Sequence, residues 1–229
     1  MTIANVFMGV RFLQMTDFNY QPLFELAPDD TPFRKLTSDG VSMSRFNGRD
    51  ILVVEPEVLR EVTRVAFDDI AHLLRPGHLA QLRGIIDDSE ASQNDKFVAL
   101  ELLRNANIAA GRVLPGCQDT GTAIVMGHKG ERVLTFSDDH IPLSQGIFDA
   151  YEQRNLRYSQ MAPLDMYQEK NTGSNLPAQI EIYAEPGDEY ELLFVAKGGG
   201  SANKSFLYQE TKALLNPAAL THFIETKLK

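Results

Sequence analysis

The chain changes character once, near its only cysteine, and this change constrains the fold more than any other feature of the sequence. From Pro56 to about Ile108, apolar residues recur at helical spacing in three successive segments. After Cys117 the apolar residues alternate or form short runs bounded by glycine, which indicates strands. Helical segments followed by strands predict an α+β fold, with a helical N-terminal half packed beside a small mixed β-sheet.

The helical segments carry their own start signals. Pro56 occupies a favoured first helical position, and Ser92 and Asp95 have the spacing of a capping box at the start of the third segment. We expect Pro76-Gly77 to end the first helix. Its apolar stripe consists of Val58, Leu59, Val62, Val65, Ala66, Ile70 and Leu73.

Strands are expected on both sides of these helices. Asn47-Gly48 predicts a hairpin turn that leads into residues 51–54. Beyond the cysteine, residues 122–126 and 132–136 indicate paired strands around a turn at 127–130, with His128 at the hairpin tip. Later elements are predicted as a helix over 142–156, a long ordered loop over 157–178, strands over 179–184 and 190–196 joined by a turn, and a final helix after Asn216-Pro217.

Composition narrows the range of partners. At 43% hydrophobic and 23% charged residues, the chain of 229 residues is typical of a soluble globular protein. The single cysteine excludes an internal disulfide and fits a reducing compartment. The formal net charge of −9 argues against nucleic acid or an anionic membrane as the main partner. We therefore expect a cytoplasmic protein that acts on a small molecule, with residues 1–35 forming an extended or partly disordered arm.

The residues around Cys117 have the composition of a site. A Pro-Gly turn precedes the thiol, and Gln118 and Asp119 follow it. These residues alone leave three interpretations open. The thiol can be a nucleophile that needs a histidine base, a small buried hydrophobic side chain, or a metal ligand that needs partner ligands. The five histidines form no recognisable motif around it.

A second candidate site lies between a predicted strand and a predicted helix, at Lys197-Gly198-Gly199-Gly200-Ser201. Successive glycines let backbone N–H groups approach an anion closely, at a helix N-terminus whose dipole favours negative charge. The spacing differs from that of a Walker loop, and an ordinary turn is the alternative. Arg157 opens the long loop, and its guanidinium suits a carboxylate, although a solvated surface arginine is the commoner case.

Four ordered motifs stand out. They are Leu114-Pro-Gly-Cys-Gln-Asp-Thr-Gly-Thr-Ala, Arg157-Tyr-Ser-Gln with Ala162-Pro-Leu-Asp-Met, Asn171-Thr-Gly-Ser-Asn-Leu-Pro-Ala-Gln, and Ala196-Lys-Gly-Gly-Gly-Ser-Ala-Asn-Lys. In these motifs the sequence resembles class I fumarate hydratase, the iron–sulfur hydro-lyase family that also includes L-tartrate dehydratase. The resemblance runs from about Leu36 to the end of the chain.

The resemblance implies a reversible hydration of fumarate to (S)-malate by a homodimeric enzyme. It also implies a four-iron four-sulfur cluster with one open iron that acts as a Lewis acid. By the same comparison, Cys117 matches one of three cluster ligands, and Asp119 matches a catalytic residue that assists a hydroxyl-bearing base. Gln118, Arg157, Gly199 and Gly200 match residues that bind the substrate.

The chain departs from the family pattern, because the other two cluster cysteines, the family's other substrate-binding Arg and Lys residues and its proposed base are expected beyond Lys229. We therefore expect residues 36–229 to be the truncated N-terminal, cluster-binding domain of a longer enzyme, without its C-terminal domain. This fragment is expected to be inactive and to hold no cluster. The alternatives are a dehydratase of tartrate or another C4 dicarboxylate, or a non-catalytic binding or assembly module that retains the family motifs.

Overall fold

The computed structural model describes residues 33–200 and 205–228 of the chain. Residues 36–229 form one unit, which is separate from residues 1–35. The predicted N-terminal arm therefore lies almost wholly outside the described residues. Within the described part of the chain, every helix is too short or too polar to cross a membrane.

The first elements form a hairpin whose turn residues suit their backbone. Strand β1 (Val41–Phe46) pairs antiparallel with β2 (Arg49–Val54). Between them, Asn47 and Gly48 both have positive φ, at 49° and 79°, which Asn and Gly adopt more readily than other residues. The short strand β4 (Val133–Leu134) extends this sheet by pairing parallel with β2. The predicted hairpin is confirmed.

Three helices follow, as the apolar periodicity predicts: α1 (Pro56–His72), α2 (Pro76–Asp87) and α3 (Gln93–Ala109). The capping box is present, because the Ser92 hydroxyl accepts from the Asp95 N–H and the Asp95 carboxylate accepts from the Ser92 N–H. The expectation for Pro76-Gly77 was wrong. Helix α1 ends at His72, and Pro76 begins α2, where its missing N–H costs no helical hydrogen bond.

The central sheet has the order β7-β3-β8, with β3 (Thr122–Gly130) in the middle. Strand β7 (Gln179–Glu185) runs parallel to β3, and β8 (Tyr190–Lys197) runs antiparallel to it. Strands β7 and β8, which the sequence predicts to be connected by a turn, are therefore not paired with each other, because β3 lies between them. The sheet is mixed and small, as expected.

The predicted hairpin at residues 127–130 was wrong. Strand β3 continues through His128 to Gly130, and β4 belongs to the other sheet. The β7–β8 connection passes over the end of β3, and Glu131 and Arg132 donate backbone N–H groups to Glu185 O and Gly187 O at 2.8 and 2.9 Å. A Cβ at Gly130 would lie 2.6 Å from Gly187 O. This glycine therefore permits a close crossing and does not mark a turn.

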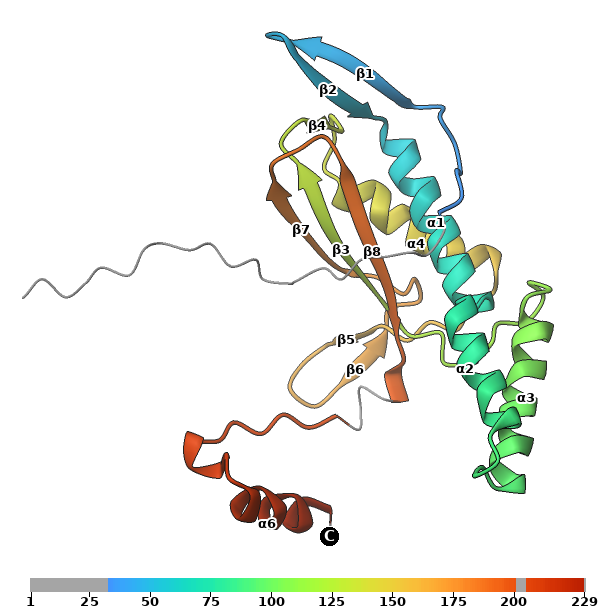
Figure 1. The fold of residues 1–229 in the computed structure, drawn as a ribbon. Helices are drawn as coiled ribbons and strands as arrows, with labels where there is room; N and C mark the ends of the chain where they lie inside the picture. The colour runs from blue at the N-terminus through green and yellow to red at the C-terminus, as the bar shows by residue number, and fades with distance from the viewer. Residues whose placement is uncertain (1–32, 201–204, 229) are drawn as a thin grey trace, which may run out of the picture. The chain divides into compact units, whose positions relative to one another are not determined.

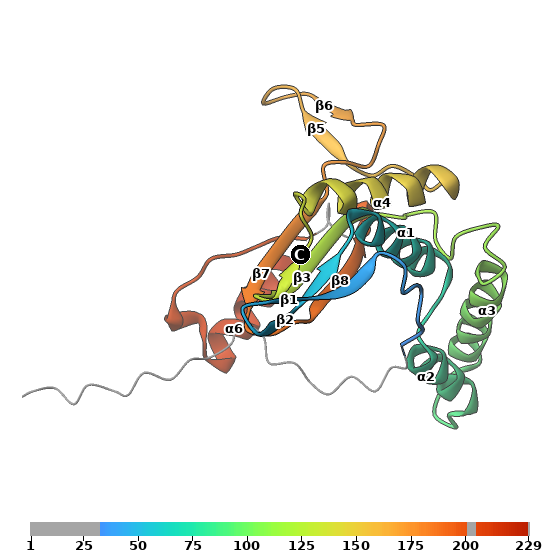
Figure 2. The same cartoon turned by 90° about the horizontal axis from the view of Figure 1, so that it is seen from above.

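Helices α1 and α4 (His140–Gln153) pack together against one face of the central sheet (Figures 1 and 2). Their side chains form the main core together with alternate residues of β3. Phe67 of α1 packs edge-on against Phe194 of β8, with ring centroids 5.9 Å apart. The core includes Leu59, Phe67, Ala123, Val125, Leu143, Ile147 and Tyr151.

The remaining elements are small. The predicted loop 157–178 contains two short paired strands, β5 (Met161–Pro163) and β6 (Glu169–Asn171). Gly199 and Gly200 have helical backbone, and the continuation of the helix predicted there lies outside the described residues. A short 3-10 turn, η1 (Lys212–Leu214), precedes α6 (Pro217–Leu228). Together these elements confirm the predicted α+β class.

The contact between α1 and α4 depends on the absence of a side chain at Gly146. A Cβ at this position would lie 2.3 Å from Arg60 O and 2.7 Å from Thr63 Cβ. We predict that Gly146→Ala lowers the free energy of unfolding by about 2–3 kcal/mol, because the two helices must separate. Urea denaturation followed by circular dichroism measures this change.

Gly84 in α2 provides the matched control, since nothing lies within 4 Å of its would-be Cβ. Gly84→Ala is expected to leave stability unchanged or raise it by up to about 1 kcal/mol, because alanine is the better helix former. Equal losses in both variants would contradict the proposed role of Gly146.

Candidate functional site

The turn that carries Cys117 is fixed by two helices. The Gly116 N–H donates to Ala71 O in the last turn of α1 at 2.8 Å, and Gly116 O accepts from the Asn105 side chain on α3 at 2.7 Å. The thiol of Cys117 is exposed. The Asp119 N–H donates to its sulfur at 3.4 Å. The backbone before the thiol is thus anchored, while the sulfur itself faces solvent.

The glycine loop binds the carboxylate of Asp119. The Gly199 N–H donates to Asp119 Oδ1 and the Gly200 N–H donates to Oδ2, both at 3.1 Å. These two donors lower the pKa of Asp119, and the positive charges of Arg157 and Lys197 add to the effect. The sequence predicted an anion-binding loop here, and the loop does bind an anionic group, which is the chain's own.

Gly121 joins the cysteine segment to the central sheet. Its φ is +78°, and a Cβ would lie 2.6 Å from both the carbonyl carbon and oxygen of Lys197. Its carbonyl oxygen accepts from the Tyr151 hydroxyl at 3.0 Å and from Asn175 Nδ2 at 3.1 Å. Only glycine fits this position, because both its backbone conformation and its approach to β8 exclude a side chain.

Asn175 is fully buried and ties the long loop to the same point. Its Oδ1 accepts from the Ser159 and Gln160 N–H groups at 2.8 and 3.1 Å, in addition to the bond from its Nδ2 to Gly121. The hydroxyl of Tyr151 also donates to Thr120 O at 2.8 Å. Burial raises the pKa of Tyr151 to about 12. The neutral phenol is therefore the form that holds the loop at neutral pH.

Arg157 lies at the start of this loop. Its carbonyl oxygen accepts from Thr120 Oγ1 at 2.7 Å, and its side chain is exposed. Because its charge lowers the pKa of Asp119, the guanidinium lies within electrostatic range of that carboxylate. Gln118 is exposed between Cys117 and Asp119. The structure therefore brings the predicted site residues together near the start of β3 and the end of β8.

Residue-level reasoning missed the supporting network of Thr120, Tyr151 and Asn175. From the sequence, Tyr151 was only part of the helix predicted over 142–156, and Asn175 was only part of a motif. The sequence does carry a signal for Asn175. That signal is its place within a motif; the need for hydrogen-bond partners follows only from its burial in the fold.

A cavity of about 330 Å³ adjoins the site, and Cys117, Asp119 and His72 lie on its wall. Most of its lining comes from apolar side chains of α1, α2, α3 and the segment just after α1, which include Phe67, Leu82, Leu102 and Leu73. An anion gains little from apolar walls. The glycine loop with Arg157 is therefore the better place for a negatively charged ligand.

The fold and the site together define an α+β domain with an exposed thiol beside a loop of backbone anion donors. The family model for fumarate hydratase (Fumerase) matches residues 60–229. The chain belongs to the fumarate hydratase family, which confirms the resemblance seen in the four motifs.

Several relatives match most of this chain. The aerobic class I fumarate hydratase of Escherichia coli K12 is 56% identical over 212 residues, which cover 93% of this chain and 39% of that protein. The mitochondrial fumarate hydratase 1 of Leishmania major is 54% identical, over 93% of this chain and 40% of that protein. The L(+)-tartrate dehydratase subunit alpha of Escherichia coli UTI89 is 28% identical over 50% of this chain and 38% of that protein. The chain thus spans about two fifths of the fumarate hydratases that it matches.

The hydrogen bonds at Gly121 are expected to contribute to the stability of the chain. Tyr151→Phe removes the hydroxyl that bonds Thr120 O and Gly121 O, and leaves the ring in the core. We expect the free energy of unfolding to fall by about 1–2 kcal/mol. Tyr167→Phe is the control, because Tyr167 is 87% exposed. This substitution is expected to change the free energy of unfolding by less than about 0.5 kcal/mol. Urea denaturation of both variants measures the difference, and equal effects would argue against the network.

The lowered pKa of Asp119 makes a second prediction. A carboxylate whose pKa is lower in the folded chain stabilises that chain above its unfolded pKa, and this contribution is lost as the pH falls through the folded pKa. Asp119→Asn is therefore expected to be less stable than the parent at about pH 6, with the gap narrowing below about pH 4. Urea midpoints across this range measure the gap. A gap that stays constant with pH would show that the two glycine N–H groups do not favour the charged form.

Proposed function

We propose that this chain forms part of a hydro-lyase that reversibly hydrates fumarate to (S)-malate. The observation that carries the proposal is the contact between Asp119 and the Gly199 and Gly200 N–H groups beside the Cys117 thiol, in a chain of the fumarate hydratase family. In this contact the Cys117 thiol, a carboxylate and two backbone N–H donors lie within one small region. A C4 dicarboxylate requires such donors at each end.

Cys117 suits the role of one ligand to a four-iron four-sulfur cluster. Its sulfur is exposed, and its backbone is held by α1 and α3. Such clusters are held by several thiolates, and this chain has one cysteine. The proposal therefore requires cluster ligands in addition to Cys117. When bound, the cluster would supply a Lewis-acidic iron at the substrate.

The other residues act on the substrate by binding and orienting it. Gly199 and Gly200 would donate backbone N–H groups to a substrate carboxylate that displaces Asp119 from them. Arg157 would supply a guanidinium for a charged pair. Gln118 would add a side-chain amide between the thiol and the carboxylate. The displaced Asp119 carboxylate would accept a hydrogen bond from a hydroxyl-bearing base and orient it toward the carbon-bound proton.

Tartrate is the second candidate substrate. It is also a C4 dicarboxylate, so the same donors suit it, and a relative at 28% identity is named as a tartrate dehydratase subunit. The identity to fumarate hydratases is about twice as high and covers 93% of the chain, which favours fumarate. A non-catalytic assembly module is the third candidate, and it requires no turnover of either acid.

The proposal is tested on a longer protein that continues this chain over the full length of its relatives. After anaerobic reconstitution with iron and sulfide, this protein is expected to show the visible absorption of a cluster and to consume fumarate faster than tartrate. Cys117→Ser is expected to lose the absorption and at least about 99% of the turnover, because the open-site cluster is no longer held.

Two comparisons complete this test. Gln118→Glu is expected to keep the cluster while weakening fumarate binding, because it places a negative charge beside a dianion. The chain of 229 residues alone is expected to remain without a cluster and without activity. Faster turnover of tartrate, or full activity of Cys117→Ser, would overturn the proposed substrate or the proposed ligand respectively.

A further inference from the structure

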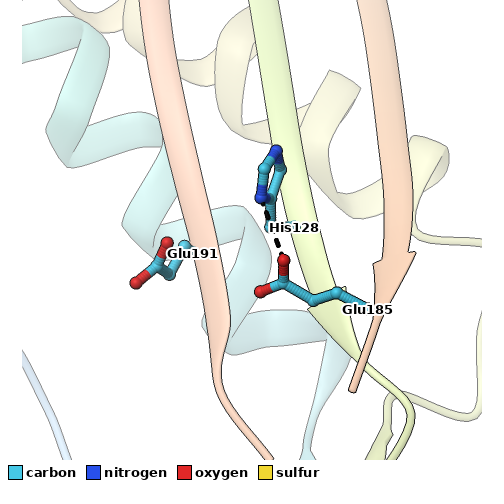
Figure 3. A group of neighbouring side chains, drawn as sticks. All are labelled: His128, Glu185 and Glu191. Atoms are coloured by element: carbon cyan, nitrogen blue, oxygen red, sulfur yellow. Dashed lines mark hydrogen bonds and ion pairs between the residues drawn. The ribbon is translucent and has the colours of Figure 1, made fainter. Parts of the chain in front are cut away.

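Three side chains with metal-binding atoms meet on the central sheet, at the end far from Cys117. His128 lies on β3, directly opposite Glu191 on the neighbouring β8. Glu185 is the last residue of β7, on the other side of β3. One ligand atom from each of the three residues lies within 4.8 Å of the other two. Figure 3 shows the interaction between His128 and Glu185, with Glu191 on the neighbouring strand.

This cluster is separate from the candidate site described above. Val125 points into the core, so His128, three residues later, points to the opposite face of the sheet. Six residues of extended strand separate His128 from Thr122, next to the glycine loop, which amounts to about 20 Å. The three residues therefore have no contact with the proposed fumarate chemistry.

The spacing within the cluster suits a bound ion. His128 Nδ1 lies 3.1 Å from Glu185 Oε2. Two ligands of a tetrahedral zinc ion, each about 2.0–2.1 Å from the metal, lie about 3.3 Å apart. A cation can thus replace the shared proton with little movement of either side chain. The Tyr183 ring packs edge-on against the imidazole, at 5.9 Å between centroids, and limits its rotation.

The charges of the cluster also favour a cation. Two carboxylates and one imidazole carry a net negative charge, which a divalent ion neutralises. Among the described residues, the carboxylate of Glu191 makes no hydrogen bond or ion pair, so it is available to turn toward a metal. A donor set of one imidazole and two carboxylates suits zinc-type transition metals better than magnesium, which prefers oxygen ligands.

We propose that His128, Glu185 and Glu191 form a binding site for a divalent transition-metal ion of the zinc type, completed by water. The ion would connect β7, β3 and β8 at the end where the β7–β8 connection crosses β3. The backbone there is already positioned by the sheet and by the Gly130 crossing. Binding would therefore stabilise the sheet without requiring it to refold.

The experiment is a titration of this chain with Zn²⁺, carrying Cys117→Ser so that the thiol cannot contribute. Isothermal titration calorimetry measures stoichiometry and affinity, and the visible spectrum with Co²⁺ reports tetrahedral coordination. We expect one ion per chain, and an affinity at least about tenfold weaker in both His128→Gln and Glu191→Gln. Mg²⁺ is the comparison ion and is expected to bind at least about tenfold more weakly than Zn²⁺.

His140 offers a matched control. Its Nδ1 also lies 3.1 Å from a carboxylate oxygen, that of Asp138, but the described residues place no second carboxylate in that group. His140→Gln is expected to leave Zn²⁺ binding unchanged. The proposal is overturned if no ion binds at millimolar Zn²⁺, or if binding survives unchanged in His128→Gln and Glu191→Gln. Glu191 is exposed, so Glu191→Gln is expected to fold. A loss of Zn²⁺ binding in this variant therefore reports the loss of a ligand and not unfolding.

Discussion

The candidate site depends on one close approach of two backbones, at Gly121. Three segments distant in sequence converge on this residue: the strand end at Lys197, the helix residue Tyr151 and the loop residue Asn175. All of the hydrogen-bonding groups are buried, where an unpaired polar group costs about 1–3 kcal/mol. The network therefore favours one arrangement strongly. Cys117 precedes Gly121 by four residues, and the glycine loop follows directly on the end of β8 at Lys197. The contacts at Gly121 therefore position the Cys117 segment and the glycine loop relative to each other.

The two faces of the central sheet serve different purposes. The face covered by α1 and α4 holds the apolar core. The same two helices support the site, because the turn before Cys117 is hydrogen-bonded to the end of α1 and the Tyr151 hydroxyl of α4 is hydrogen-bonded to Thr120. The opposite face carries His128, Tyr183 and Glu191. Strand β3 thus links the candidate site at its first residue to the ionisable cluster near its last.

Local signals predicted the local structure well. Asn47-Gly48, Pro56 and the Ser92–Asp95 pair each act within a few residues, and the structure confirms all three. Gly127 and Gly130 misled the prediction because glycine also occurs where a side chain would collide with a distant segment. Gly127 faces Leu192 and Tyr190, and Gly130 faces Gly187. These neighbours cannot be identified before the strand order is known.

The site shows the same limit. Sequence reasoning alone identified the thiol and the glycine loop as separate candidates, and only the family resemblance joined them. The pairing of Asp119 with Gly199 and Gly200 spans about eighty residues, beyond the range of any local pattern. The histidine–glutamate cluster was missed entirely, because it exists only through the register of three strands.

The contact between Asp119 and the glycine loop has a consequence for selectivity. An anion from solution that uses these two N–H groups must displace a carboxylate that is already there, tethered at an effective concentration in the millimolar range or above. A small monoanion with a single weak contact competes poorly against such an internal ligand. A molecule with two carboxylates gains a second attachment that the tethered side chain cannot match. Under the proposed function, the loop would therefore favour a ligand with two carboxylates over a monoanion, before any contact to the carbon skeleton is made.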